Sequence, residues 1–166
     1  MEAKCYYKIG AIHEKMEELE KAVEYVEKFL EICKNDGESE QSKNMIGKAY
    51  KKLAELHSKL GNASAAILNL EELFKIAQHG ANKQGQAEAA LKLGLLNYKE
   101  GLIPTSVNYL LKHFEIAKHM GNGSLIDTSR VNLGIAKANG QIDNYFKQIM
   151  SDAHSVIDFL NEPKQN

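Results

Sequence analysis

The sequence predicts an all-α fold: a right-handed superhelix of three helical hairpins followed by C-terminal capping helices. Two recurring patterns indicate it. The pair Leu93-Gly94 recurs as Leu53-Ala54 forty residues earlier and as Leu133-Gly134 forty residues later. Phe114-x-Ile116-Ala117 likewise repeats Phe74-x-Ile76-Ala77. The chain has only 2 prolines, which favours long uninterrupted helices. A fixed period of this length is typical of stacked helical repeats.

The expected hairpins follow one another, and glycine marks most of their ends. The first repeat, about 3–37, contains helices at 3–16 and 19–34, and the turn between them lacks the glycine of the later turns. Asn35-Asp36-Gly37 ends the second helix, because glycine readily takes the left-handed conformation after a last turn. The next repeats, about 38–82 and 83–123, contain expected helices at 39–60, 63–79, 84–100 and 104–120.

The pattern degenerates after residue 123. A further helix is expected at 124–138, and Asn139-Gly140 closes it. The next segment, 142–150, is interrupted by Ser151-Asp152. Either residue suits the N-cap of a last helix at 153–161.

We interpret residues 1–166 as a single domain. Residues 124–162 form a degenerate fourth repeat and a cap over the apolar face of repeat three, and 163–166 form a polar tail. The array starts inside a repeat, so we expect either a fragment of a longer protein or an array that lacks an N-terminal cap.

Composition argues against several classes of partner. The net charge is −1, and the one arginine, Arg130, supplies few of the bidentate contacts that specific nucleic-acid binding favours. No apolar run approaches the roughly 20 residues that span a membrane, and no secretory signal begins the chain. Cys5 and Cys33 are too few for a disulfide scaffold, which favours a reducing, cytoplasmic compartment.

No local spacing points to catalysis, a metal or a cofactor. The sequence lacks His-Glu-x-x-His, Cys-x-x-Cys and phosphate-loop motifs. His13 and His57 share one repeat position, so packing explains them better than ligation. His79, His113 and His119 lie near the ends of second helices, where a polar or cationic group suits the helix C-terminus. We therefore expect a non-enzymatic protein without cofactors.

The hairpins resemble the tetratricopeptide repeat. An early aromatic residue, Tyr6 or Tyr50, precedes the Leu-Gly pair, and Gly61 and Gly101 stand at the turn positions. The small residue of the second helix is matched by Ala22, Ala66 and Ser106. The departures are a period of 40 to 44 residues instead of about 34, and His13, His57 and Asn97 in place of the usual tyrosine. The long form is similar to LGN/Pins-type and rapsyn-type scaffolds, which implies a non-catalytic scaffold or adaptor.

A narrower resemblance covers residues 125–138. Leu125-Ile126-Asp127, Val131 and Gly134-Ile135-Ala136-Lys137-Ala138 look like the last repeat of tetratricopeptide-repeat proteins of cilia and flagella. This resemblance implies an axonemal protein linked to dynein-driven motility. The alternatives are a structural oligomerisation element, whose first repeat stacks on another copy, and a cytoplasmic LGN/Pins-type regulatory adaptor.

In this family the first helix of each hairpin lines a concave groove that binds a protein or peptide. The matching positions here are lysine-rich in the N-terminal half and apolar in the C-terminal half. The candidate groove residues are Tyr7, Lys48, Lys51, Lys59, Leu91, Leu95, Tyr98, Val131 and Ile135. We expect a partner segment with apolar anchors toward the C-terminal repeats and acidic residues over the lysines. The alternative is that the cap or the tail covers the apolar half.

Overall fold

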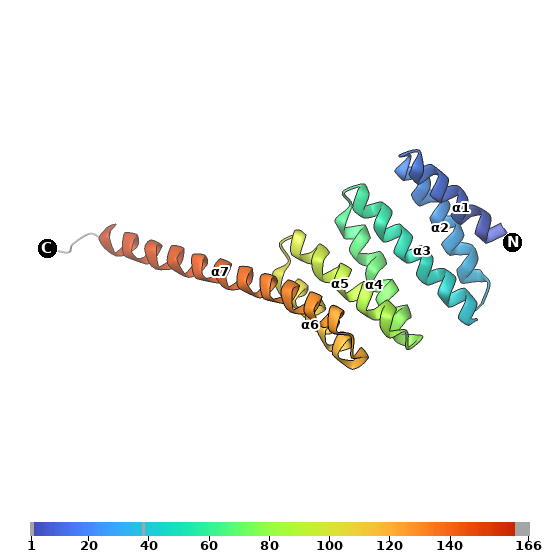
Figure 1. The fold of residues 1–166 in the computed structure, drawn as a ribbon. Coiled ribbons are helices and arrows are strands. Elements are labelled where there is room, and N and C mark those ends of the chain that lie inside the picture. Colours follow the sequence, from blue (N-terminus) through green and yellow to red (C-terminus); the bar gives the residue numbers. More distant parts are fainter. Residues whose placement is uncertain (1, 38, 162–166) are drawn as a thin grey trace.

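The computed structural model describes residues 2–37 and 39–161, with the side chains of 2, 143 and 152–161 outside the description; the expected tail at 163–166 also lies outside it. Seven helices follow one another in the described residues (Figure 1). They are α1 (Glu2–Lys15), α2 (Leu19–Asn35), α3 (Glu40–Lys59), α4 (Ala63–His79), α5 (Lys83–Lys99), α6 (Ile103–Met120) and α7 (Gly123–Asn161).

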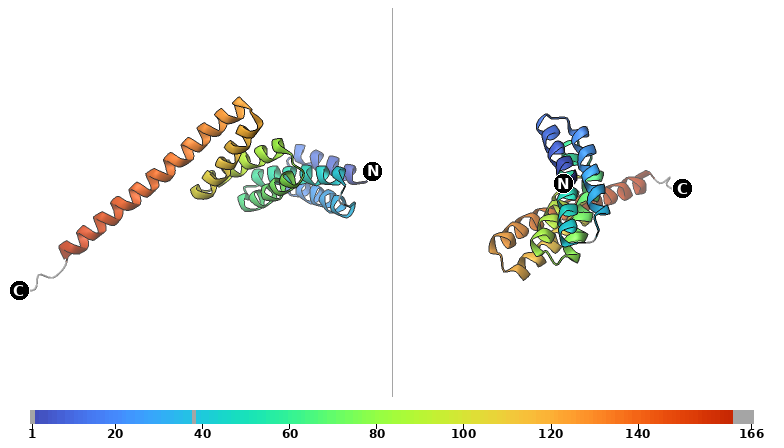
Figure 2. Two further views of the ribbon diagram at one scale, coloured as in Figure 1. Left: turned by 90° about the horizontal axis from the view of Figure 1, so that it is seen from below. Right: turned by 90° about the vertical axis from the view of Figure 1, so that its right-hand side faces the viewer.

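Consecutive helices pair into the three predicted hairpins, α1/α2, α3/α4 and α5/α6, which stack side by side (Figures 1 and 2). Between hairpins, α2 packs on α3 and α4 on α5. The buried residues form two clusters along the stack: one centres on Val26, Phe29 and Leu53, and the other contains Leu70 and Leu93. The all-α helical-repeat fold is thereby confirmed.

Residues in the left-handed conformation make most of the turns. Gly61, Gly101 and Gly121 have φ of 75°, 74° and 64°. The first turn lacks glycine, as its sequence indicates, and Glu17 takes φ 61° in its place. A side chain carries an energetic cost in this region that glycine does not have. The first hairpin therefore contains a strained turn that the later hairpins avoid.

A glycine marks the closest approach of two helices in the third hairpin. A Cβ on Gly94 of α5 would lie 2.6 Å from Cγ of Leu110 in α6. Ser106 of α6 is fully buried at this crossing, and its hydroxyl donates a 2.7 Å hydrogen bond to the Gly94 carbonyl oxygen. The Leu-Gly pair and the small residue of the second helix thus have a shared reason: together they let the helices touch.

The C-terminal region differs from the prediction. One continuous helix, α7, replaces a helix ending at Ala138 and separate capping helices. Gly140 is helical and lies beside Ile103, and its φ is not positive, unlike that of Gly121. Without that conformation the chain does not reverse there. Ser151-Asp152 likewise lies within the helix, since neither residue removes a backbone donor as proline does.

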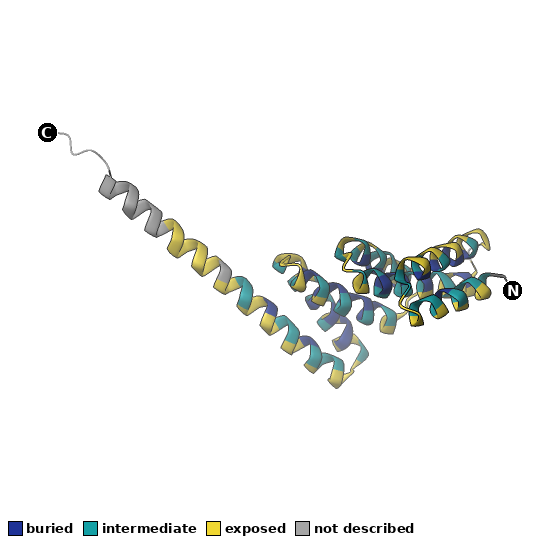
Figure 3. Ribbon diagram, turned by 90° about the horizontal axis from the view of Figure 1, so that it is seen from above, coloured by how far each residue is buried: buried dark blue, intermediate teal, exposed yellow. Residues whose placement is uncertain are grey.

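Only the first part of α7 packs against the array. Its main contacts are with α6, and a few reach α5. Beyond them the helix projects away from the stack, and from Gln141 its described side chains are exposed (Figure 3). The covering of repeat three therefore comes from the N-terminal part of the single helix α7, and not from separate capping helices.

Candidate protein-interaction surface

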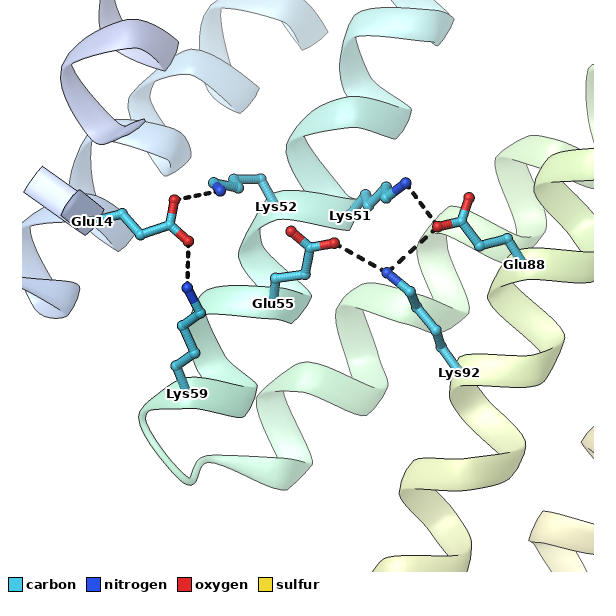
Figure 4. A network of polar contacts seen from close by, with 7 residues as sticks. All are labelled: Glu14, Lys51, Lys52, Glu55, Lys59, Glu88 and Lys92. Carbon is cyan, nitrogen blue, oxygen red and sulfur yellow. Dashed lines mark hydrogen bonds and ion pairs between the residues drawn. The ribbon is translucent and has the colours of Figure 1, made fainter. Parts of the chain in front are cut away.

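The first helices of the three hairpins are joined by a network of ion pairs (Figure 4). Glu14 of α1 contacts both Lys52 and Lys59 of α3, with 2.8 Å to the Lys59 Nζ. This contact ties α1 directly to α3. The same face of α3 also contacts α5, so α1, α3 and α5 present one shared face, which we call the first-helix face.

The α3–α5 part of the network contains four residues. Lys51 Nζ lies 2.7 Å from Oε1 of Glu88. Lys92 Nζ lies 3.0 Å from Oε1 of Glu55 and 3.5 Å from Oε1 of Glu88. The four lysines of the whole network therefore face three glutamates, and little positive charge remains free.

The pKa shifts of two of these glutamates agree with this pairing. Burial raises the pKa of Glu14, but the hydrogen bonds and charges of Lys52 and Lys59 outweigh it, so the pKa lies below its ordinary value. Burial also acts on Glu88, and Lys51 with Lys92 lowers its pKa in the same way. Both carboxylates are thus ionised at neutral pH. The lysine-rich half of the surface is compensated from within, which sequence reasoning did not foresee.

A hollow of about 450 Å³ opens on the first-helix face between α3 and α5. Its apolar lining includes Leu70 from α4 and Leu95 and Leu96 from α5. Its remaining lining residues are Ala54, Glu55, Ser58, Lys59, Lys92 and Lys99. The hollow therefore offers an apolar floor with lysines around it, a combination typical of sites that bind a mixed apolar and acidic segment.

The apolar half of the predicted groove is open. Leu95 is 42% exposed, and on α7 Val131 and Ile135 are 61% and 49% exposed. Leu91 is half-buried. The Tyr98 hydroxyl accepts a hydrogen bond from the Asn139 side chain, which ties α5 to α7. The described part of α7 leaves Leu95, Val131 and Ile135 exposed, and the expected tail lies outside the described residues.

The other predicted site residues are spread more widely. Tyr7 packs inward, its ring centroid 5.1 Å from that of Phe29. Lys48 lines a second hollow with Lys51, at the opposite end of α3 from Lys59. The structure thus brings Lys59 and Leu95 to one hollow and places the remaining lysines elsewhere on α3.

Sequence reasoning missed the lining residues Leu70, Leu96 and Lys92. One signal was available for the last of these: Glu88 and Lys92 are four residues apart, the spacing at which side chains meet on a helix. The positions of Leu70 and Leu96 depend on how hairpins stack, and no local pattern reports that.

Histidine chemistry gives no alternative site. His113 is 1% exposed in the interior between α6 and α7, in contrast to the expectation of a polar group near a helix end. Ser129 Oγ donates to the Leu125 carbonyl oxygen at 2.6 Å and so accepts from Nδ1 of His113 at 2.7 Å. Burial lowers the pKa of His113, which keeps it neutral. Among the described residues, no group of three or more potential ligands is placed so that it could hold a metal ion.

Stacked hairpins with a shared face and a hollow define a helical-repeat interaction domain. The family model of the tetratricopeptide repeat matches residues 3–36, so the chain contains a tetratricopeptide repeat. None of the helices in the described part of the chain is both long and apolar enough to cross a membrane.

Known proteins are similar over most of the chain. Tetratricopeptide repeat protein 29 of Macaca fascicularis is 26% identical over 150 residues, which cover 89% of this chain and 31% of the relative. The protein of the same name from Trypanosoma brucei brucei is 24% identical over 135 residues, 81% of this chain and 27% of the relative. These matches agree with the resemblance to tetratricopeptide-repeat proteins and extend it over most of the chain. The chain thus spans about a third of these relatives.

A solved structure shares the fold. An archaeal STAND protein with a tetratricopeptide repeat sensor, from Pyrococcus horikoshii, superposes with a TM-score of 0.74 at 17% identity, over 84% of this chain and 21% of that one. The fold is therefore that of a tetratricopeptide-repeat solenoid. Such folds are in general non-catalytic scaffolds for protein–protein interaction.

Proposed function

We propose that the chain is a non-catalytic adaptor that binds a partner segment along the first-helix face. The observation that carries this proposal is the hollow beside Leu95, which has an apolar floor and lysines at its edge. Lys99 has no ion-pair partner among the described residues. It is therefore available to a carboxylate, in contrast to the lysines that Glu14, Glu55 and Glu88 hold.

The preferred partner segment carries a large apolar side chain next to an acidic residue. The apolar side chain enters the hollow, and the acidic residue pairs with Lys99. This refines the simpler expectation of acidic residues over all the lysines, because displacing Glu14 or Glu88 from its lysines would break existing ion pairs. Affinity is expected to come from the apolar contact, and charge to set orientation and encounter rate.

A peptide selection tests the site directly. A displayed library of random peptides is selected on the wild-type chain, and the enriched peptides are measured by fluorescence anisotropy. Leu95→Glu is expected to weaken binding at least about tenfold, since it places a carboxylate over the apolar floor. Leu68→Glu is the matched control: Leu68 is also a solvent-exposed leucine, on α4 and outside the hollow.

The outcomes are distinct. Enriched peptides with apolar and acidic residues, weakened by Leu95→Glu and not by Leu68→Glu, support the proposal. Peptides that bind both variants as well as wild type contradict it. Unchanged circular dichroism of both variants shows that the helices are intact.

We further propose that the adaptor acts in a cilium or flagellum, within the axoneme and its dynein-linked machinery. Support comes from the resemblance of residues 125–138 to ciliary and flagellar repeat proteins and from the similarity to tetratricopeptide repeat protein 29. A tagged chain expressed in ciliated cells is expected to remain with axonemes after detergent extraction, and Leu95→Glu to reduce that retention. Complete release of the wild-type chain into the detergent-soluble fraction would contradict the axonemal location.

A further inference from the structure

The projecting part of α7 carries a row of apolar residues that no other described helix covers. Ile142, Tyr145, Phe146 and Ile149 are 51%, 64%, 62% and 43% exposed. They are spaced by three, one and three residues, which places them along one side of a helix. Large exposed apolar patches of this kind usually mark an interaction site.

The row extends in both directions. We call it the α7 stripe, and in the sequence it consists of Val131, Ile135, Ala138, Ile142, Tyr145, Phe146, Ile149, Ala153, Val156 and Leu160. With Tyr145-Phe146 taken as one position, its average spacing is close to the 3.6 residues of a straight α-helix, so the stripe stays on one side along the helix.

This side is opposite the one that α7 turns toward α6. Ser129 and Ala136 are fully buried on the α6 side, and Gly140 touches Ile103 there. That side continues as the exposed polar residues Asn144 and Lys147. The array therefore uses the small and polar side of α7 and leaves the described part of the apolar stripe free. Figure 2 shows the distal part of α7 standing clear of the other helices.

The spacing of the stripe residues is the same in both directions along the helix. Its successive spacings are 4, 3, 4, 3, 1, 3, 4, 3 and 4 residues, symmetric about the Tyr145-Phe146 pair. A two-fold dimer needs a surface that is complementary to itself. When two such helices run antiparallel, Ile142 of one copy faces Ile149 of the other, and Tyr145 faces Phe146.

We propose that α7 is a self-association helix that pairs antiparallel with α7 of a second copy through the stripe. Helices of this length in contact over about 44 Å bury roughly 1,000 Å² in total, the lower range of specific interfaces. The stripe contains no charged residue, so no unpaired charge becomes buried. None of the residues that line the hollow beside Leu95 belongs to the stripe.

Complementary charges test the antiparallel register. Ile142→Lys and Ile149→Glu are made separately, and self-association is measured by sedimentation equilibrium. Each homodimer contains its charge twice in an apolar seam, so each variant is expected to dimerise at least about 100-fold more weakly than wild type. Mixing the two variants is expected to restore a heterodimer, because the introduced lysine then faces the introduced glutamate, while the two unchanged isoleucines face each other.

Two matched variants serve as controls. Lys147→Glu changes the polar side of α7 and is expected to leave dimerisation unchanged. Ile12→Glu places a charge at another exposed isoleucine, on α1, and distinguishes the stacking of first repeats from pairing through α7. Circular dichroism of every variant verifies that helicity is retained.

The proposal is overturned by any of three results. The wild-type chain is monomeric at about 100 µM, a concentration at which even weak dimers are populated. Ile12→Glu dissociates the dimer while Ile142→Lys does not. The mixed variants associate no better than either alone, which would mean a parallel register or a different protein as the occupant of the stripe.

Discussion

Substituting alanine for glycine at two equivalent repeat positions is expected to change stability in opposite directions. Gly94 in α5 and Gly134 in α7 occupy the same place in successive repeats. A Cβ at 94 would lie 2.6 Å from Cγ and 2.7 Å from Cδ2 of Leu110, while nothing lies within 4 Å of a Cβ at 134. The difference arises because α7 has no second helix of its own hairpin to approach it.

The magnitudes follow from packing and helix propensity. Apolar carbons normally approach to about 3.5–4.0 Å, so Gly94→Ala forces a shift of nearly 1 Å. Leu110 is 1% exposed, and its backbone nitrogen is already 3.4 Å from that Cβ, so it has little room to retreat. Overpacking typically costs about 1–3 kcal/mol, and replacing a helical glycine by alanine returns about 1 kcal/mol. Gly94→Ala is thus expected to lower the free energy of unfolding by up to about 2 kcal/mol, and Gly134→Ala to raise it by up to about 1 kcal/mol.

Urea unfolding followed by circular dichroism measures both changes. The wild-type chain and the two variants are compared at equal concentration, so that any self-association affects all three alike. A Gly94→Ala variant that unfolds at the same or a higher urea concentration than wild type would refute the close α5–α6 contact. A destabilised Gly134→Ala would refute the open face of α7.

Three further predictions concern single residues. Glu17→Gly is expected to raise the free energy of unfolding by about 1 kcal/mol, because glycine relieves the left-handed strain at φ 61°; an unchanged urea midpoint would contradict this. Glu14→Gln is expected to destabilise the chain at pH 7, since Lys52 and Lys59 lose their carboxylate. The destabilisation should shrink as the pH is lowered, because the pKa of Glu14 is lowered in the folded state and its stabilisation is lost as the pH falls through that value. The same destabilisation at every pH of an acid titration would argue against the ion pairs. Burial lowers the pKa of His113, so the unfolded chain takes up a proton before the folded one, and wild-type stability should fall as the pH drops below about 6.5. His113→Leu is expected to make stability depend less on pH in this range. Parallel pH profiles of the two proteins would contradict this.

Several local features could be read from the sequence because local residues cause them. The turn glycines and the apolar spacing locate the first six helices to within one residue or so of their observed ends. The sequence also showed that the first turn lacks glycine, and there Glu17 takes the left-handed conformation. The exposed apolar residues Leu95, Val131 and Ile135 were also identified, since repeat positions determine which side of a helix they occupy.

The neutralised lysines were not predictable in the same way. Lys59 meets Glu14 across 45 positions of sequence, and Lys92 meets Glu55 across 37. Such pairs depend on the offset between neighbouring hairpins, which the period of the repeat does not specify. The prediction of groove lysines from repeat positions therefore overstated the free positive charge of the surface.

The sequence by itself determined the repeat and its first six helices, because these depend on apolar spacing and turn residues along a short stretch. Only the tertiary structure decided how the end of the chain is used. Gly134 retains the repeat's glycine, yet α7 continues straight through Gly140 and leaves that glycine open. One continuous helix and a helical hairpin would have the same apolar spacing over this segment. They differ only in the backbone conformation of the residue at the turn. That difference leaves the α7 stripe exposed.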